Sequence, residues 1–386
     1  MMGKPKIRFK GYNEDWEQRK LGEIAPLRGG YAFQSNNFLE EGIPIVKISN
    51  ILSTGEVAGE FSFYEELDND TNFILPDKAA VLAMSGATTG KVSILSNPSN
   101  IKFYQNQRVG YFKKTDGINY PFISTLVRSQ VFNNQLNSIL VTGAQPNVSS
   151  KDIDDFDVLI STSYKEQKKI GAYFSNLDHL ITLHQHKCDE MKKLKKYMLQ
   201  KMFPQNGKKV PEIRFDGFTN DWEQRKLSDV VDSVDTGKSK FDKEGSSGEY
   251  PILGSTSVIG YDAEYDYEGD FILTARVGAN AGSLYRHAGK VKISDNTVFI
   301  QASQNIEFLY QLLIRFDIKR LSFGTGQPLV KASELKRLEL MMPTDMEEQM
   351  RIGVYFKNLD HLITLHQHKC DEMKKLKKYM LQNMFV

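Results

Sequence analysis

Apolar or small residues recur at alternating steps of four and three between residues 165 and 203. They fall at positions Ile170, Phe174, Leu177, Ile181, His184, Cys188 and Met191 and, after a charged break, at Met198 and Met202. This spacing is typical of a coiled-coil seam. Glycine and proline are absent between Gly171 and Pro204. The pattern therefore predicts one continuous helix about 58 Å long, at ~1.5 Å per residue.

The same helix pattern occurs twice in the chain. Residues 176–203 return at 358–385 with an offset of 182, and the 28 positions differ only at Lys201 versus Asn383. A shorter repeat has an offset of 206: Ile-Arg-Phe at 7–9 and Trp-Glu-Gln-Arg-Lys-Leu at 16–21 return at 213–215 and 222–227. Such repeats indicate duplicated structural units.

Between the repeats lie two segments, 22–164 and 228–344, that barely resemble each other. Faint echoes survive as Gln145-Pro146 and Gln327-Pro328, and as Glu166-Gln167 and Glu348-Gln349. Ordinary gene duplication with uneven drift is one interpretation. Different functions of the two kinds of segment explain the contrast better. The repeated segments would keep the same partner or packing, and the two variable segments would bind different targets.

Two long helices in one chain are expected to pack on each other. An antiparallel pair places the variable segments at opposite ends of the rod, brings the C-terminus back towards the N-terminus and gives a pseudo-twofold molecule. A parallel pair would require residues 228–344 to span the rod.

Two features of these helices have alternative interpretations. Seam residues His184, Cys188, His366 and Cys370 could meet as a zinc site, although small seam-filling residues are the simpler interpretation, and we predict no metal site. The lysines at 192, 193, 195 and 196, mirrored at 374, 375, 377 and 378, are expected to form a solvated face, with contact to a DNA backbone as the alternative.

Composition narrows the class of protein. The net charge is +2, so any nucleic-acid footprint must be local. Hydrophobic content of 40% and charged content of 25% fit a soluble globular protein. The chain lacks a run of 18 apolar residues, its first residues do not resemble a signal peptide, and two cysteines suit a reducing compartment. We therefore expect a cytoplasmic protein.

The variable segments predict mixed α/β structure with little catalytic chemistry. Apolar strands are expected at 43–48, 79–84 and 271–274, and helices at 121–136 and 306–321. His287 is the only histidine in either segment, and neither segment contains cysteine. Residues 86–91, Gly-Ala-Thr-Thr-Gly-Lys, are one residue too short for a phosphate-binding loop, and the chain contains no amino-methylation motif.

Polar loop residues beside the expected strands suit base edges and phosphates. Arginine pairs with guanine, and asparagine or glutamine with adenine, while lysine and threonine usually hold phosphate. Taken singly, any of these residues could be merely exposed. The candidate DNA-binding residues are Lys47, Ser49, Asn50, Thr88, Thr89, Lys91, Gln107, Arg108 and Gln145 in the first segment and Lys238, Lys240, Ser255, Thr256, Arg276, Asn280 and Gln327 in the second.

The order of these motifs resembles that of Type I restriction–modification specificity subunits over essentially the whole chain. Each variable segment follows a Trp-Glu block (16–21 and 222–227) and ends in Gln-Pro, Glu-Gln and a long helix. The resemblance implies an α+β fold: two mixed α/β target-recognition domains joined by two long helices in an antiparallel coiled coil, as a pseudo-twofold tandem repeat. The expected regions are 1–21, an N-terminal conserved segment; 22–164, the first target-recognition domain; 165–203, the central helix; 204–227, a linker with the repeated Trp-Glu block; 228–344, the second target-recognition domain; and 345–386, the C-terminal helix.

The resemblance also implies a function. Each target-recognition domain would read one half of a bipartite site in double-stranded DNA, and the helices would set the spacing and bind two methyltransferase subunits. Motor-nuclease subunits would complete the complex, and no membrane is involved. The chain itself would carry no cofactor and no catalytic residue, because partner subunits use S-adenosylmethionine, ATP and Mg²⁺. A structural coiled-coil scaffold without specific DNA binding, and an enzyme using clefts of the variable segments, are the alternatives.

Overall fold

A computed structural model describes residues 2–140, 147–205, 207–240, 248–321 and 328–386. The chain divides into two compact units. The first unit contains Met1–His184 and Lys369–Val386, and the second contains Gln185–His368. Each unit therefore contains one variable segment together with part of each long helix.

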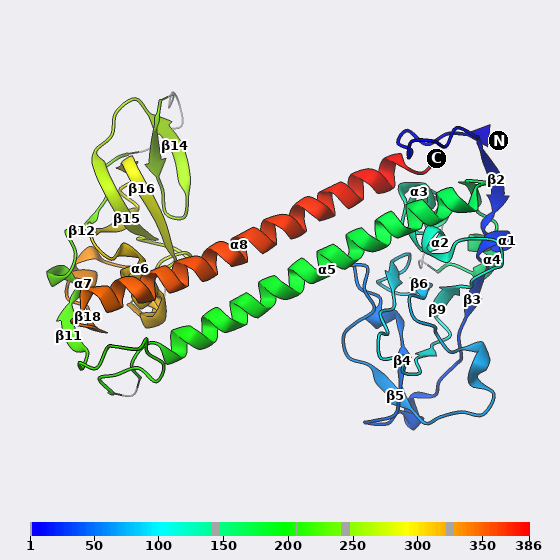
Figure 1. The fold of residues 1–386 in the computed structure, drawn as a ribbon, viewed down its shortest axis with the longest axis horizontal. Helices are drawn as coiled ribbons and strands as arrows, with labels where there is room; N and C mark the ends of the chain where they lie inside the picture. Colours follow the sequence, from blue (N-terminus) through cyan, green and yellow to red (C-terminus); the bar gives the residue numbers. More distant parts are fainter. Residues whose placement is uncertain (1, 141–146, 206, 241–247, 322–327) are drawn as a thin grey trace. The chain divides into compact units, whose positions relative to one another are not determined.

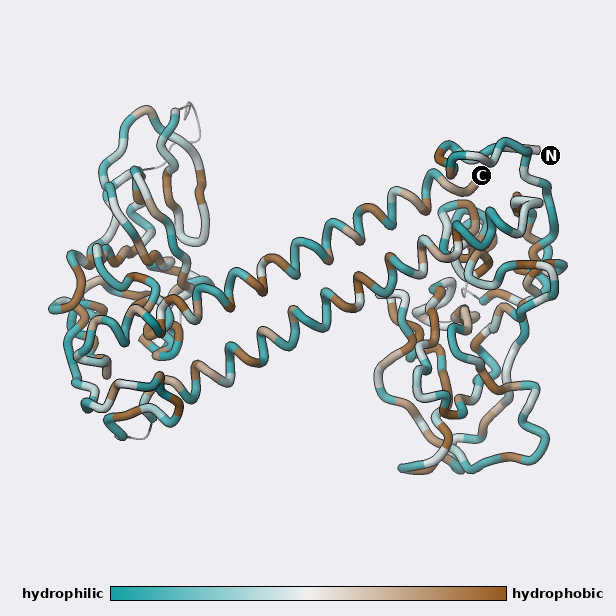
Figure 2. The backbone as a smooth tube through the Cα atoms, in the orientation of Figure 1, coloured by the Kyte–Doolittle hydropathy of each residue, from teal (hydrophilic) through white to brown (hydrophobic). Residues whose placement is uncertain are grey.

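The two predicted helices are α5 (Tyr164–Lys201) and α8 (Met346–Asn383), each of 38 residues. Hydrophobic bands alternate with hydrophilic ones along both helices (Figure 2). Seam residues Phe174 and Cys188 are fully buried, as the predicted spacing requires. Antiparallel pairing is confirmed within each unit (Figure 1). As the residue number increases along α5, the number of the α8 residue that it contacts decreases. The contacts are Asp178–Lys377 (2.6 Å) and Ile181–Cys370 (3.9 Å) in the first unit, and Cys188–Ile363 (3.7 Å) and Lys195–Asp360 (2.6 Å) in the second.

The first variable segment is built on two sheets, and a third sheet joins its ends. The four-stranded sheet has the order β3 (Leu27–Gly29), β9 (Val109–Phe112), β6 (Ala80–Ala83), β7 (Val92–Ile94). A three-stranded sheet has the order β5 (Ser62–Tyr64), β4 (Ile43–Val46), β8 (Tyr104–Gln105). The third sheet contains β1 (Met2–Gly3), β2 (Trp16–Lys20) and β10 (Asp157–Ile160). The helices are α1 (Leu21–Ile24), α2 (Tyr120–Leu126), α3 (Gln130–Leu140) and α4 (Ser150–Asp154), with short 3₁₀ turns η1 (Ser35–Asn37), η2 (Ile48–Asn50) and η3 (Asp70–Asn72).

The second variable segment forms one six-stranded sheet and one strand pair. The sheet order is β12 (Ser233–Thr236), β17 (Thr297–Gln301), β15 (Tyr267–Ala275), β16 (Leu284–Ile293), β13 (Tyr250–Leu253), β14 (Val258–Asp262). The pair is β11 (Glu223–Lys226) with β18 (Glu339–Met342). The remaining elements are α6 (Ile306–Phe316), α7 (Ala332–Lys336), η4 (Leu227–Asp229) and η5 (Ile318–Leu321).

The two variable segments share one topology despite their different sequences. The order β3-β9-β6-β7 in the first corresponds to β12-β17-β15-β16 in the second. The parallel pairing of β4 with β8 corresponds to that of β13 with the end of β16. The α+β tandem repeat predicted from the sequence is confirmed, and the duplication includes the variable segments.

The predicted helices of the variable segments needed correction. The stretch 121–136 is not one helix, because α2 ends at Leu126 and α3 begins at Gln130. Between them the buried hydroxyl of Ser129 accepts a hydrogen bond from the Phe132 amide (3.4 Å), which caps the start of a new helix. The stretch 306–321 is also divided, since Asp317 adopts a left-handed conformation (φ 61°) between α6 and η5.

The repeated sequence motifs meet around a buried glutamate. In the first unit, Glu166 is 0% exposed and accepts hydrogen bonds from the Arg8 guanidinium (2.6 and 2.8 Å) and the Trp16 indole (3.2 Å). The bond to Glu166 raises the pKa of Arg8 above its ordinary value. We call this arrangement the glutamate clamp. It joins the N-terminal motif to the first turn of α5.

The second unit repeats the glutamate clamp with its own residues. Glu348 is 0% exposed and accepts from Arg214 (2.7 and 2.8 Å) and from the Trp222 indole (3.3 Å). The clamp explains why the motifs at 7–21 and 213–227 recur together with the Glu-Gln pair, although they are far apart in the sequence.

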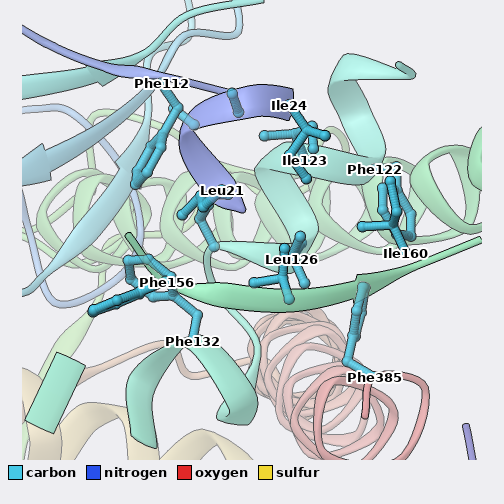
Figure 3. Close-up of a cluster of buried hydrophobic side chains, with 14 of the residues drawn as sticks. Leu21, Ile24, Phe112, Phe122, Ile123, Leu126, Phe132, Phe156, Ile160 and Phe385 are labelled. Carbon is cyan, nitrogen blue, oxygen red and sulfur yellow. The ribbon is translucent and has the colours of Figure 1, made fainter. Parts of the chain in front are cut away.

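A phenylalanine at the end of a long helix completes each core. In the first unit, the ring of Phe385, just after α8, lies 6.0 Å from that of Trp16 and 5.7 Å from that of Phe122. Figure 3 shows Phe385 and Phe122 within this buried cluster. In the second, Phe203, just after α5, lies 5.9 Å from Trp222 and 6.0 Å from Phe308. Aromatic burial of this kind stabilises the attachment of the helix end to the domain core.

The glutamate clamp predicts a large loss of stability when its carboxylate is removed. In Glu348→Ala the Arg214 guanidinium stays largely buried without its partner, which we expect to lower the free energy of unfolding by about 3–5 kcal/mol. The matched control is Glu347→Ala, whose carboxylate is exposed and pairs with Arg351 (2.6 Å). A surface pair of that kind contributes about 0–1 kcal/mol. Urea denaturation of both variants measures the difference, and equal stability would contradict the structural role of the clamp.

Candidate nucleic-acid interface

Three loops of the first unit meet at the ends of its strands. They are the Lys47 loop (47–50), the glycine loop (84–91) and the Arg108 loop (106–108). The Asn106 amide donates to the Val46 carbonyl (3.1 Å), and the Met84 amide donates to the Arg108 carbonyl (3.0 Å). The Thr88 hydroxyl donates to the Ile48 carbonyl (3.1 Å) and connects the glycine loop to the Lys47 loop. Sequence candidates that are up to 61 residues apart thus lie on one connected surface.

The second unit contains the same three loops, at 254–257, 276–283 and 294–296. The Ser294 amide donates to the Leu253 carbonyl (2.9 Å), and the Arg276 amide donates to the Asn296 carbonyl (2.9 Å). The Ser255 hydroxyl also donates to the Asn296 carbonyl (3.2 Å). Val46 therefore corresponds to Leu253, and Met84 corresponds to Arg276.

The glycine loops match residue by residue with an offset of 192. Gly-Ala-Thr-Thr-Gly-Lys at 86–91 corresponds to Gly-Ala-Asn-Ala-Gly-Ser at 278–283. All four glycines have positive φ (80°, 86°, 87° and 82°), a conformation that other residues rarely adopt. Each loop is a turn between antiparallel strands, β6 and β7 or β15 and β16. A phosphate-binding loop would instead lead from a strand into a helix. The geometry of residues 86–91 thus differs from that of a phosphate-binding loop, as their length also indicated.

Most of the predicted binding residues lie on these loops and are accessible. The exposed ones are Ser49, Gln107, Arg108, Lys238, Lys240, Thr256, Arg276 and Asn280. The half-buried ones are Lys47, Thr88, Thr89, Lys91 and Ser255. Gln145 and Gln327 lie outside the described residues. The chain just after them reaches the glycine loops, since the Val148 amide donates to Met84 (3.0 Å) and the Val330 amide to Arg276 (2.8 Å).

Asn50 is the exception, because its side chain faces the protein. It is 1% exposed, and its amide oxygen accepts from the Lys47 backbone (3.0 Å). Its amide nitrogen donates to the carbonyls of Ala58 (3.2 Å) and Glu60 (3.0 Å). Both donor positions and the oxygen of this buried amide are engaged within the protein, so we withdraw Asn50 from the candidate ligand contacts.

Sequence reasoning missed a fourth segment of this surface. Tyr31, 44% exposed, accepts at its carbonyl from the Gln107 amide (2.8 Å). Ser239 accepts in the same way from the Asp295 amide (3.1 Å) and lies between the two predicted lysines 238 and 240. A glycine close to each residue was the available sequence signal. Gly30 directly precedes Tyr31, and Gly237 lies two residues before Ser239; glycine often marks a turn at a strand end.

Charges of both signs surround the lysines of the second unit. Lys238 and Lys240 line a hollow of about 520 Å³ together with Asp262, Asp266 and Lys292. Hydrogen bonds from the Glu264 backbone and from Lys292 lower the pKa of Asp262 below its usual value, so its carboxylate is ionised at neutral pH. The hollow therefore contains negative as well as positive charge, and it is not a simple binding site for an anion.

The thiols of the two seam cysteines contact carbonyl oxygens of the facing helix. The Cys188 thiol lies 3.7 Å from the Ile363 carbonyl, and the Cys370 thiol lies 3.9 Å from that of Ile181. Among the described residues, His, Cys, Asp and Glu side chains form no group of three or more that could hold a metal ion. The same part of the chain contains no helix that is both long and apolar enough to cross a membrane.

Comparison with known proteins identifies the family. The family described as Type I restriction modification DNA specificity domain matches residues 13–193 and 219–375. The chain belongs to this family. Each matched region of this specificity-domain protein contains one variable segment and most of the long helix that follows it.

Relatives of this specificity-domain protein match along most of its length. The Type I restriction enzyme MjaVIII specificity subunit of Methanocaldococcus jannaschii is 24% identical, and the match covers 95% of this chain and 91% of the relative. The putative MjaX specificity subunit of the same organism is 20% identical over 95% and 92% of the two chains. The crystal structure of a Type-I restriction-modification system S subunit from M. genitalium has the same fold, with a TM-score of 0.75 over 100% of this chain and 99% of that one at 14% identity.

The burial of Asn50 predicts a structural phenotype. Asn50→Ala removes three hydrogen bonds of a buried side chain to the backbone of Lys47, Ala58 and Glu60, and we expect it to lower the free energy of unfolding by about 1–3 kcal/mol. The neighbouring Ser49→Ala, at an exposed position, is the control and should change stability by about 0.5 kcal/mol or less. Hydrogen exchange of residues 47–62 in both variants tests this. An altered DNA base preference in Asn50→Ala with unchanged protection would show that the residue contacts DNA after all.

Proposed function

We propose that this chain is the DNA-reading subunit of a Type I restriction–modification complex, in which each variable segment reads one half of a bipartite site in double-stranded DNA. The observation that carries this proposal is the pair of equivalent loop surfaces. Both units hold three loops with the same backbone hydrogen bonds, while the side chains on the loops differ. A constant frame with different polar side chains is what two readers of different sequences require.

Catalysis is proposed to reside in partner subunits rather than in this chain. His287, the only histidine of the variable segments, lies on β16, and burial lowers its pKa, so it is neutral at pH 7. The surface loops offer amides, hydroxyls and cations, which suit recognition better than nucleophilic catalysis. Methyltransferase subunits would supply S-adenosylmethionine chemistry, and motor-nuclease subunits would use ATP and Mg²⁺. The complex would work in the cytoplasm, and the paired helices would set the spacing of the half-sites.

Two methyltransferase subunits are proposed for each chain. Through the 28-residue repeat, residues 176–184 of α5 in the first unit recur as 358–366 of α8 in the second, and residues 369–385 of the first unit recur as 187–203 of the second. A partner that binds one unit through these helix segments therefore finds nearly the same sequences in the other, with the two helices exchanged. A structural scaffold without specific DNA binding is the alternative. It predicts no sequence preference even when the partners are present.

Exchange of one segment tests the proposed function. Replacing residues 228–344 with the corresponding segment of a relative leaves both glutamate clamps in place. We expect the methylated motif to change in one half only, because each reader has its own loop surface. Long-read methylation mapping in cells that also carry the methyltransferase gene is the measurement. Replacing residues 22–164 is the reciprocal control and should change the other half. A change in both halves, or no sequence preference at all, would contradict modular reading.

The stoichiometry of the complex is a second test. Co-expression of this chain with its methyltransferase should give a complex with two methyltransferase subunits per chain. Native mass spectrometry measures the ratio directly. A fully active complex with one methyltransferase would exclude the two-site interpretation, while leaving the reading of DNA by the variable segments in place.

A further inference from the structure

Residues 108 and 296 occupy the same position in the two loop surfaces. In the first unit the Met84 amide donates to the Arg108 carbonyl (3.0 Å), and the Arg108 amide donates to the Asn106 side chain (3.3 Å). In the second unit the Arg276 amide donates to the Asn296 carbonyl (2.9 Å), and the Asn296 amide donates to the Ser294 hydroxyl (3.3 Å). In each unit the carbonyl of this residue accepts one hydrogen bond and its amide donates one, so its backbone is held in the same way.

The rest of the loop confirms this register. The Val109 amide donates to Asn106 (2.9 Å), and the Thr297 amide donates to Ser294 (3.0 Å). The preceding residues, Gln107 and Asp295, donate to Tyr31 and Ser239 respectively. Four pairs of corresponding hydrogen bonds therefore support the equivalence of 108 with 296, although the surrounding sequences, Asn-Gln-Arg-Val and Ser-Asp-Asn-Thr, share no residue.

Both side chains are accessible, and their polar groups lack a charged or a hydrogen-bonding partner, respectively, among the described residues. Arg108 and Asn296 are both exposed. Within the described residues, the Arg108 guanidinium forms no ion pair and the Asn296 amide group forms no hydrogen bond. A fixed backbone with a free polar side chain is the arrangement expected of a recognition residue, because little backbone order is lost on binding.

Two other pairs of equivalent positions differ in the kind of side chain they carry. Lys47 corresponds to Gly254, and Lys91 corresponds to Ser283, so a long cationic side chain is present in one unit only. Such differences suit contacts with phosphate, whose number can vary between the two half-sites. At 108 and 296, by contrast, both units carry a side chain that can form two hydrogen bonds with one base.

The charge of Asp295, the residue before Asn296, indicates that this loop faces bases rather than phosphates. Asp295 directly precedes Asn296, and a carboxylate close to a DNA phosphate would be repelled. The same carboxylate can accept a hydrogen bond from the exocyclic amine of cytosine in the major groove. Gln107, its counterpart in the first unit, is a standard partner of adenine.

On the basis of the proposed function, we propose that Arg108 and Asn296 are equivalent specificity-determining residues. Arg108 binds O6 and N7 of a guanine in the half-site of the first segment. Asn296 binds N6 and N7 of an adenine at the corresponding place in the other half-site. Both pairings use two parallel hydrogen bonds in the major groove.

Single substitutions in the complete methyltransferase complex test this assignment. Arg108→Ala should relax one guanine position in one half-site, with discrimination falling about 10- to 100-fold there. Asn296→Ala should relax one adenine position in the other half-site. The exchange Arg108→Asn should move the preference at its position from guanine towards adenine. Methylation mapping shows the motif, and binding to oligonucleotides with single base changes gives the fold-change. Both positions are exposed, so the melting temperature should stay at the wild-type value.

A matched control separates base reading from loss of charge. Lys114→Ala removes one exposed cation just beyond the other end of β9, and it should leave base preference unchanged. If Arg108 held a phosphate, Arg108→Ala would weaken binding to all sequences uniformly and reduce the salt dependence by about one ion. That result, or an unchanged motif at wild-type efficiency, would overturn the assignment. A wild-type motif without guanine in the half governed by residues 22–164 would also overturn it, while leaving the proposed function intact. Only a wild-type complex without a bipartite motif would contradict the proposed function itself.

Discussion

The architecture depends on a buried carboxylate that cannot be left without its partners. Glu166 and Glu348 are both fully buried, and each accepts hydrogen bonds from an arginine and a tryptophan that lie at least 126 residues away in the sequence. Removing the arginine or the glutamate would leave its charged partner unpaired in the protein interior, which strongly destabilises the fold. The arginine and glutamate therefore have to be retained together, and the tryptophan donates a further hydrogen bond to the same carboxylate.

The glutamate clamp also explains how a segment can vary between fixed ends. In each unit the arginine and tryptophan precede the variable segment, and the glutamate follows it at the start of the long helix. The strand pairing of β2 with β10, and of β11 with β18, closes the same junction. The segment between is thus tied at its base, and its loops can change without altering the attachment to the helices.

The periodic spacing of apolar residues predicted the long helices, because a helix depends on contacts between residues close together in the sequence. The seam from Ile170 to Met202 predicted α5, and the order of helices and variable segments along the chain led to the antiparallel pair. The break between α2 and α3 was missed, since it depends on the buried hydroxyl of Ser129 rather than on proline or glycine. The burial of Asn50 was missed for a similar reason, because its partners Ala58 and Glu60 meet it only through the fold.

The candidate interface was only partly predictable because its equivalences are carried by backbone hydrogen bonds. The Gly-Ala-x-x-Gly pattern at 86–90 and 278–282 is visible in the sequence, but its offset of 192 matches neither of the offsets of the constant repeats, 182 and 206. The correspondence of Arg108 with Asn296 has no sequence signal at all, because no side chain takes part in the bonds from Met84 and Arg276 that define it. A loop whose backbone is fixed by main-chain atoms leaves its side chains free to diverge.

Charge balance fits the division of labour between affinity and specificity. Nonspecific DNA binding grows with the number of phosphates that a protein neutralises. In this chain, with a net charge of +2, Lys238 and Lys240 share their hollow with the ionised Asp262 and with Asp266. Acidic neighbours weaken the attraction to phosphate and leave relatively more of the binding energy to hydrogen bonds with bases. Under the proposed function, such a subunit would gain its sequence discrimination from a few loop side chains and would depend on partner subunits for much of its binding to the DNA backbone.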